Sequence, residues 1–197
     1  MVWTATCLVD LIAKYTRIEN EYDVMNDSGH KLKGDYKTWG TSISAEYGKC
    51  FESKSGFYFD PSVELTLGRI NGKDYNAHSD YLSSVGVKKD MEVQQDAFNT
   101  FVGRLGFRVG QKLDNASYFA KLAVAHEFSG DFDTTFRAPG EPEGKTSIDF
   151  GDTWYEAQIG GSAKLSDNSM IYASFERSFG GDVDEKWRVD AGLRFSF

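Results

Sequence analysis

The last eleven residues, Trp187-Arg-Val-Asp-Ala-Gly-Leu-Arg-Phe-Ser-Phe197, alternate between two kinds of side chain. A repeat of two is the period of a β-strand, whose successive side chains point to opposite faces. This stretch therefore predicts a strand with one apolar face and one polar face. The apolar set is Trp187, Val189, Ala191, Leu193, Phe195 and Phe197, and the other set is Arg188, Asp190, Gly192, Arg194 and Ser196.

Seven earlier segments also read as strands, most of them with the same alternation. The stretch from Tyr155 to Leu165 is a clear example, whereas Leu8, Ile12 and Val102 fall on the face that is otherwise polar. Only 3 of the 197 residues are Pro, which suits paired strands because Pro cannot donate to a ladder. The eight predicted strands lie near residues 3–22, 36–51, 56–71, 97–111, 116–132, 152–165, 169–179 and 186–197.

The connections between these segments alternate in length. Short polar turns lie at Glu52–Ser55, Lys112–Asn115 and Ser166–Asn168, and longer charged stretches lie at 23–35, 72–96 and 133–151, with a shorter one at Gly180–Glu185. Outer-membrane barrels have tight periplasmic turns and longer extracellular loops. The pattern predicts an all-β, antiparallel, up-and-down transmembrane β-barrel of this type, formed by one domain over residues 1–197, with both ends of the chain on the periplasmic side.

Composition excludes several other classes of protein. The longest apolar run is far shorter than the 18 or so residues of a membrane helix. A net charge of −8 argues against nucleic acid as a partner. Cys7 and Cys50 are expected to point to opposite faces and to remain free thiols. The first residues do not read as a signal peptide, so we expect a chain that is incomplete at its N-terminus.

The two faces predict which side meets lipid. The polar face carries eight acids and seven bases, which suits a mutually neutralising, water-filled lumen, although a solvated outer surface could look similar. The predicted lumen-facing charged residues are Asp10, Lys14, Glu46, Asp60, Glu64, Arg104, Arg108, Lys121, Glu127, Glu156, Lys164, Glu176, Arg188, Asp190 and Arg194.

The other face places aromatic rings towards the strand ends and smaller aliphatic residues between them. Aromatic girdles around an aliphatic band are typical of a bilayer-spanning surface, because amphipathic rings favour the interface. The predicted lipid-facing residues are Phe57, Phe59, Val63, Leu65, Leu67, Leu122, Val124, Tyr155, Ile159, Trp187 and Leu193.

The C-terminus and six internal segments carry a family resemblance. Asp190, Gly192, Phe195 and Phe197 resemble the terminal signal by which outer-membrane barrels are recognised for assembly, through addition of a strand. The chain resembles the β-barrel translocator domain of autotransporters, the type V secretion proteins of Gram-negative bacteria, along nearly its whole length. The segments that carry this resemblance are Val9–Tyr15, Gly56–Pro61, Gly103–Gly106, Tyr118–Phe128, Tyr172–Gly180 and Trp187–Phe195.

The resemblance implies a function and its partners. The family's barrel has twelve strands around an α-helical linker, and the chain matches roughly the last eight of them. It implies an outer-membrane domain that anchors a passenger in cis, supports its export to the cell surface, and is assembled by the barrel-assembly machinery. No catalytic constellation, cofactor site or metal site is expected, since His30, His78 and His126 are scattered.

Two alternatives remain open at this stage. One is a self-contained eight-stranded outer-membrane barrel that acts as an adhesin or a structural protein through its loops. The other is a soluble ligand-binding barrel, which would pack its aromatic residues inside.

Overall fold

The alternating segments form strands throughout a computed structural model, which describes residues 3–25, 29, 31–80, 90–181 and 186–196. Among these residues, no helix has the length and apolar character that crossing a membrane requires. The twelve strands of the described residues are β1 (Trp3–Met25), β2 (Lys31–Ser53), β3 (Phe57–Ile70), β4 (Lys73–Ser79), β5 (Met91–Gln95), β6 (Phe98–Lys112), β7 (Ala116–Glu127), β8 (Asp131–Arg137), β9 (Gly144–Asp149), β10 (Thr153–Ser166), β11 (Ser169–Phe179) and β12 (Arg188–Phe195).

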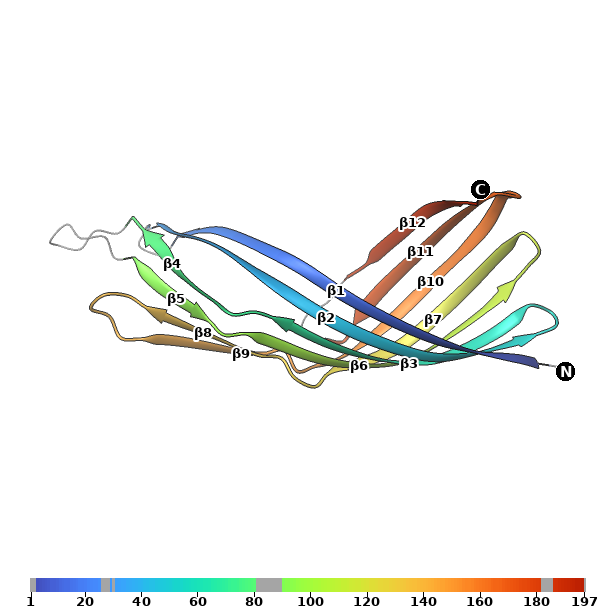
Figure 1. The fold of residues 1–197 in the computed structure, drawn as a ribbon, viewed down its shortest axis with the longest axis horizontal. Coiled ribbons are helices and arrows are strands. Elements are labelled where there is room, and N and C mark those ends of the chain that lie inside the picture. The colour runs from blue at the N-terminus through green and yellow to red at the C-terminus, as the bar shows by residue number, and fades with distance from the viewer. Residues whose placement is uncertain (1–2, 26–28, 30, 81–89, 182–185, 197) are drawn as a thin grey trace.

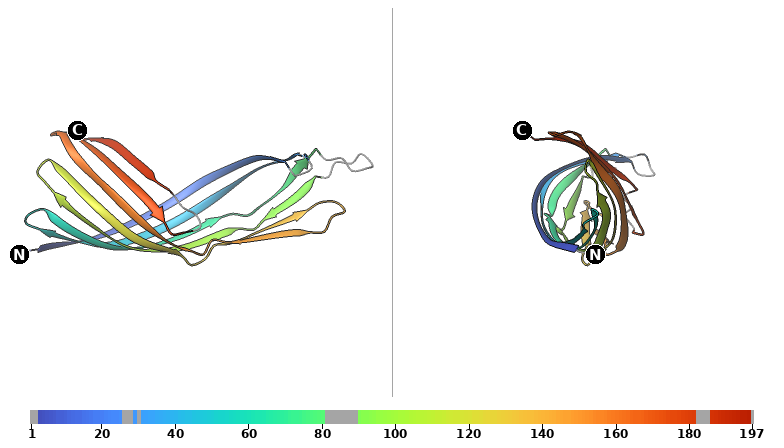
Figure 2. Two further views of the ribbon diagram at one scale, coloured as in Figure 1. Left: turned by 180° about the vertical axis from the view of Figure 1, so that it is seen from behind. Right: turned by 90° about the vertical axis from the view of Figure 1, so that its right-hand side faces the viewer.

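Eight of these strands form one antiparallel, up-and-down sheet. Its order is β12-β11-β10-β7-β6-β3-β2-β1, so each strand pairs with the next long strand along the chain. The predicted all-β antiparallel fold is thus confirmed. Over the described ranges β1 pairs only with β2 and β12 only with β11, which leaves the sheet open with two edge strands. Figure 2 shows the sheet curling around a central space in the end-on view.

The four remaining strands extend the sheet into stretches that were predicted to be long loops. Residues 72–96 and 133–151 were predicted to be loops, but they contain β4–β5 and β8–β9. The ladder continues from β2 through β4, β5 and β8 to β9. Two of these strands alternate: Ala77 on β4 and Val93 on β5 are fully buried, whereas their chain neighbours are not. We call these four strands the extension.

Two other predicted boundaries were wrong. The loop predicted at 23–35 is shorter, because β1 continues to Met25 and β2 begins at Lys31 with Met25 and Lys31 paired. The strand predicted at 116–132 ends at Glu127, where the chain bends before entering β8. The charged residues at 23–35 misled the first of these predictions, since strands that lie in water can carry charge on both faces.

The two ends of the sheet differ, as the alternating connections predicted. Figure 1 shows both termini at the end that carries the three short turns, with the extension at the opposite end. The turn after β2 is closed by the hydrogen bond that Gly56 N donates to Ser53 O (3.0 Å). The positive φ of Gly56 (80°) favours glycine, which adopts this conformation without steric strain.

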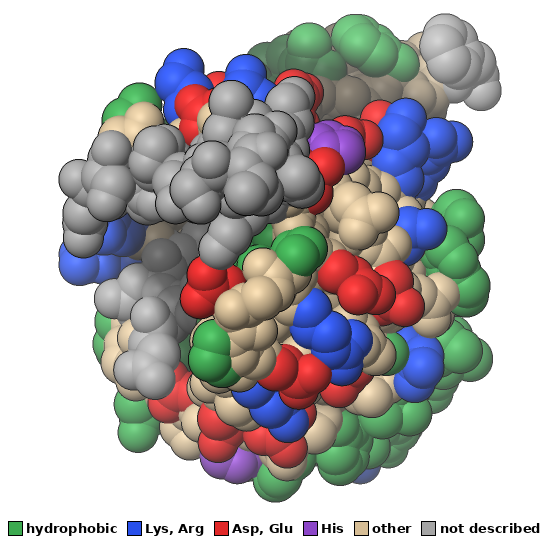
Figure 3. All heavy atoms as spheres, turned by 90° about the vertical axis from the view of Figure 1, so that its left-hand side faces the viewer, with side chains coloured by type: hydrophobic (Ala, Val, Ile, Leu, Met, Phe, Trp, Pro, Cys, Tyr) green, Lys and Arg blue, Asp and Glu red, His purple; other side chains and the backbone are tan. Residues whose placement is uncertain are grey.

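The described residues bury very few large apolar side chains. Ala123 and Ala125 are buried, as are Tyr58, Ala77 and Val93, whereas large apolar residues such as Leu11 (73% exposed) and Ile159 (61%) are open. Figure 3 shows hydrophobic side chains along the margin of the end-on view and charged ones nearer its middle. A soluble barrel would do the reverse, because burial of apolar surface drives its folding.

Candidate functional site

The strand register places all the predicted charged residues on one face, which we call the polar face. Directly paired residues share a face, so Asp10, Glu46, Glu64 and Arg104 form one row across β1, β2, β3 and β6. A second row runs from β3 to β12 and consists of Asp60, Arg108, Lys121, Gln158, Glu176 and Arg188.

Exposure on the polar face depends on strand position. Glu46, Asp60, Glu64, Arg104, Arg108, Lys121, Glu156 and Glu176 are half-buried on the inner strands. Five others are exposed because edge strands have a neighbour on one side only, and Lys164 is exposed beside a turn. Those five are Asp10, Lys14, Arg188, Asp190 and Arg194.

Arg104 is the centre of the polar face. Its Nη1 atom lies 2.8 Å from Glu64 Oε2, and its Nη2 atom lies 3.0 Å from Glu156 Oε1. Trp154 Nε1 donates to the same Glu156 oxygen at 2.9 Å. The side chains of Arg104, Glu64 and Glu156 are only 24%, 22% and 12% exposed, so one guanidinium binds two partly desolvated carboxylates and offsets part of their negative charge.

Two more arginines of the polar face have distinct surroundings. Arg188 pairs with Glu176 at 2.9 Å and with Asp190 at 3.2 Å. Arg108 lies over the Phe119 ring, 4.9 Å from its centroid, and its buried Nε has no hydrogen-bond acceptor among the described residues.

Glu127 was predicted to be one of the mutually neutralising charges of the lumen, but its partners are backbone amides. Its Oε1 atom accepts hydrogen bonds from the backbone N–H groups of Phe101 (2.7 Å) and Ser129 (3.0 Å), and the residue is only 7% exposed. It therefore holds the chain where β7 ends instead of pairing with a base.

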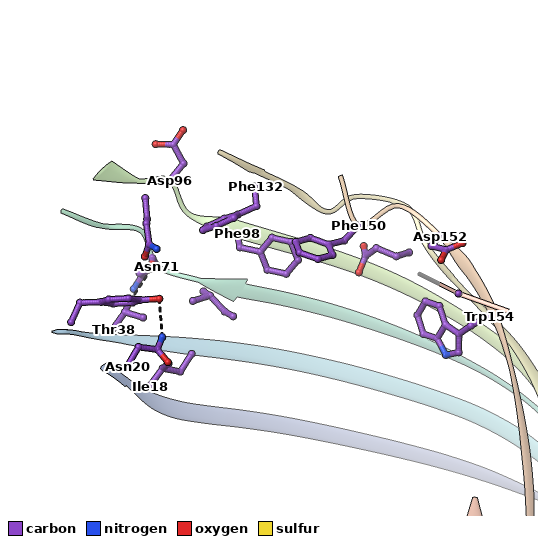
Figure 4. Close-up of a pocket in the computed structure, with 15 residues that line it drawn as sticks. Ile18, Asn20, Thr38, Asn71, Asp96, Phe98, Phe132, Phe150, Asp152 and Trp154 are labelled. Atoms are coloured by element: carbon purple, nitrogen blue, oxygen red, sulfur yellow. Dashed lines mark hydrogen bonds between the residues drawn. The ribbon is translucent and has the colours of Figure 1, made fainter. Parts of the chain in front are cut away.

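A pocket of about 570 Å³ lies on the polar side, where the long strands meet the extension (Figure 4). Phe98 makes edge-on contacts with Phe132 (6.2 Å between centroids) and Phe150 (5.4 Å), and these rings form one wall. On the opposite wall Asn20 Nδ2 donates to Tyr36 OH at 2.8 Å. The sequence analysis missed this pocket because its aromatic residues come partly from stretches assigned to loops.

The opposite face, which we call the apolar face, exposes its large side chains. Of the eleven residues predicted to face lipid, ten are 37–65% exposed, and Val124 is half-buried between its partners Leu105 and Tyr155. Ten of the eleven lie on this one face by register, and Trp187 directly precedes β12.

Aromatic pairs mark the end of the apolar face nearest the extension. Tyr15 stacks on Trp39 (5.9 Å between centroids) and Tyr155 stacks on Phe179 (5.9 Å). Beyond Tyr15 the same face of β1 and β2 becomes charged, with Lys33 Nζ 2.9 Å from Asp23 Oδ2. The hydrogen bond from Lys33 lowers the pKa of Asp23. The sequence analysis did not single out Tyr15 or Trp39, although their spacing from this charged stretch could have done so.

The predicted assembly signal lies on edge strand β12. Gly192 is opposite Tyr172 of β11, and the ring of Tyr172 occupies the space where a Cβ atom would lie. Asp190 and Phe195 are exposed, whereas Phe197 lies outside the described residues.

The cysteines behave as predicted. Cys7 and Cys50 are both free, and Cys7 Sγ lies 3.6 Å from the Tyr47 hydroxyl on the apolar face. In the described part of the chain, no group of three or more His, Cys, Asp or Glu residues is placed to hold a metal ion.

A curved antiparallel sheet with exposed apolar residues on one face and paired charges on the other defines a protein of the outer-membrane β-barrel class. The chain belongs to the autotransporter family, because the family model described as "Autotransporter beta-domain" matches residues 6–176. It is thus a protein of the bacterial outer membrane.

Individual relatives agree with this assignment. The chain is 28% identical to the pertactin autotransporter of Bordetella parapertussis over 194 residues, which cover 96% of this chain and 19% of that protein. It is 27% identical to the BrkA autotransporter of Bordetella pertussis, and the match covers 96% of this chain and 18% of that protein. The chain therefore spans about a fifth of the length of the curated relatives it matches.

A solved structure shows the same fold. The crystal structure of the β-domain of the Bordetella autotransporter BrkA superposes with a TM-score of 0.62 at 22% sequence identity. The match covers 99% of this chain and 71% of that one.

Proposed function

We propose that this β-domain anchors a passenger in the outer membrane and supports its export to the cell surface. The chain belongs to the autotransporter family, and its sheet exposes apolar residues on one face and carries the Arg104 ion pairs on the other. This arrangement of the two faces is the observation that carries the proposal. A closed barrel is the only form of sheet that satisfies every backbone group at membrane depth.

The apolar face is the proposed lipid contact. Val63, Leu65 and Ile159 are 44–61% exposed and lie between the aromatic strand ends. Burying such residues in acyl chains is favourable, whereas in water they would leave a large apolar surface that promotes association.

The polar face is the proposed lining of a hydrated path. Arg104 with Glu64 and Glu156 forms an ion-paired group that remains acidic, so an exported segment would meet charges that are already bound to each other. The aromatic wall of Phe98, Phe132 and Phe150 lies where that path opens, and there it would contact apolar side chains of the passenger.

Two other partners belong to the proposal. The barrel-assembly machinery would pair with the exposed edge of β12, the strand on which Tyr172 covers Gly192. The passenger is expected in cis. We further infer that any enzymatic activity of the whole protein resides in the passenger, because the acids at the centre of the polar face are bound to Arg104.

The orientation of the two faces can be tested with adjacent residues. In the full-length protein, with Cys7 and Cys50 replaced by Ala, spin labels are attached singly at Val63→Cys and Glu64→Cys in proteoliposomes. The label at 63 should be relaxed preferentially by oxygen, which partitions into lipid, and the label at 64 by a water-soluble nickel chelate. The reverse pattern would remove the proposal.

A further inference from the structure

Arg177 is a cation on the apolar face. On β11 it lies directly opposite Ala157, which in turn pairs with Leu122 of β7. Its neighbours two residues away on the same face are Phe175 and Phe179, which are 43% and 45% exposed. The guanidinium group is therefore surrounded by residues of lipid-facing character.

Among the described residues, two other arginines on this face have partners, whereas Arg177 has none. Arg17 pairs with Glu19 at 2.9 Å, and Arg69 donates to Asn99 Oδ1 at 2.9 Å. Arg177 makes no ion pair or hydrogen bond with any residue that the structure describes. An unpaired cation on a lipid-facing surface is tolerated near the headgroups but unfavourable at the midplane.

The surroundings of Arg177 place it near the headgroups. Arg177 lies two residues before Phe179 on β11. Phe179 stacks on Tyr155 at the end of the sheet nearest the extension. A hollow of about 630 Å³ adjoins it, and Lys186 brings a second cation to the rim. The other residues that line this hollow are Phe175, Ser178, Phe179 and Trp187.

The hollow combines two cations with apolar walls, and this combination is complementary to the phosphate and acyl chains of an anionic lipid. We propose that Arg177 and Lys186 bind a phosphate group of an outer-leaflet lipid, while its acyl chains lie along Phe175 and neighbouring residues of the apolar face. Arg suits this role because its planar fork donates two parallel hydrogen bonds to phosphate, and its aliphatic stem can reach from the apolar band to the headgroups.

The inference rests on the proposed lipid contact of the apolar face. The end that carries the extension is taken as extracellular, because short turns face the periplasm in these barrels. The headgroups nearest Arg177 are then those of the outer leaflet, where phosphorylated glycolipids such as lipid A supply the anion.

The test uses the full-length protein in phosphatidylcholine nanodiscs titrated with lipid A, with binding followed by native mass spectrometry. We expect Arg177→Gln to weaken lipid A binding about tenfold, the loss of one charge-assisted interaction. Arg177→Lys should recover part of the affinity. The matched control is Arg17→Gln, which removes an arginine of the same face that is already paired with Glu19 and should leave binding unchanged.

Every result of this binding test either supports the lipid-binding inference or overturns it. Heat-modifiable gel migration first selects the variants that fold. Equal lipid A binding by wild type and folded Arg177→Gln would overturn the inference, as would full competition by inorganic phosphate, since the ligand would then be the free anion. The spin-label result at residues 63 and 64 separates this failure from failure of the proposed function.

Discussion

The ring of Tyr58 on β3 lies against Gly110, its direct partner on β6. A Cβ atom at Gly110 would be 2.6 Å from Tyr58 Oη and 2.7 Å from Cζ, and Tyr58 is only 9% exposed. The same pairing recurs on the polar face, where an aromatic ring covers a cross-strand glycine. The other three pairs are Tyr22 with Gly34, Phe119 with Gly160, and Tyr172 with Gly192.

Gly110→Ala is expected to destabilise the folded barrel by about 1–3 kcal/mol, because the added methyl group would meet both the Tyr118 carbonyl oxygen and the Tyr58 ring. Urea unfolding in lipid vesicles, followed by tryptophan fluorescence, measures the change. Gly144→Ala is the control, since its Cβ would meet only Phe136 Cβ, at 3.9 Å. Equal stability of the two variants would show that neither the Tyr58 ring nor the Tyr118 carbonyl packs closely against Gly110.

Arg104→Met is expected to cost roughly 1.5–3 kcal/mol, because it leaves Glu64 and Glu156 as unpaired, partly desolvated carboxylates. The same unfolding assay applies. Adding Glu64→Gln and Glu156→Gln to Arg104→Met should restore part of the loss, since the repulsion then disappears. If the triple variant is less stable than Arg104→Met alone, the ion pairs are not the cause.

The faces of the long strands could be predicted from the sequence because they depend on a period of two. Between Tyr155 and Leu165 every second side chain is apolar, and the register with β11 keeps that face continuous. The mean hydropathy of −0.47 carried no such information, because the two faces cancel.

The extension and the pocket could not be predicted in the same way. Lys73–Ser79 carries charge on both faces and Gly144–Asp149 has one large apolar residue, Ile148, so their composition is that of a loop, although their backbone groups continue the ladder. The role of Glu127 depends on the bend after β7, which brings the Phe101 and Ser129 amides to its carboxylate. A pattern along one strand does not contain such contacts between strands.

Tyr75 on β4 is expected to stay protonated well above pH 10.0. Burial raises its pKa above the ordinary value of 10.0, helped by the nearby Tyr22 hydroxyl at 3.2 Å, and its ring stacks on Tyr36 at 4.8 Å. A raised pKa means that the neutral phenol stabilises the fold fully below pH 10.0, and that this contribution is lost as pH rises through the folded pKa.

Absorbance at 295 nm, which reports phenolate, checks this expectation. At about pH 11, wild type and Tyr75→Phe should show the same number of ionised tyrosines, because Tyr75 has not yet lost its proton. One extra phenolate in the wild type at that pH would contradict the expectation.

Phe150 is expected to hold the β8–β9 hairpin against the long strands. Its ring meets Phe98 edge-on at 5.4 Å, and its N–H donates to Gly130 O at 3.2 Å. An aromatic pair contributes about 1 kcal/mol beyond its area, so Phe150→Ala should speed amide hydrogen exchange across residues 131–149 several-fold. Leu165→Ala, at the other end of the sheet and 62% exposed, should leave that exchange unchanged. Unaltered protection in Phe150→Ala would mean that the hairpin is held by its backbone ladder with β5 alone.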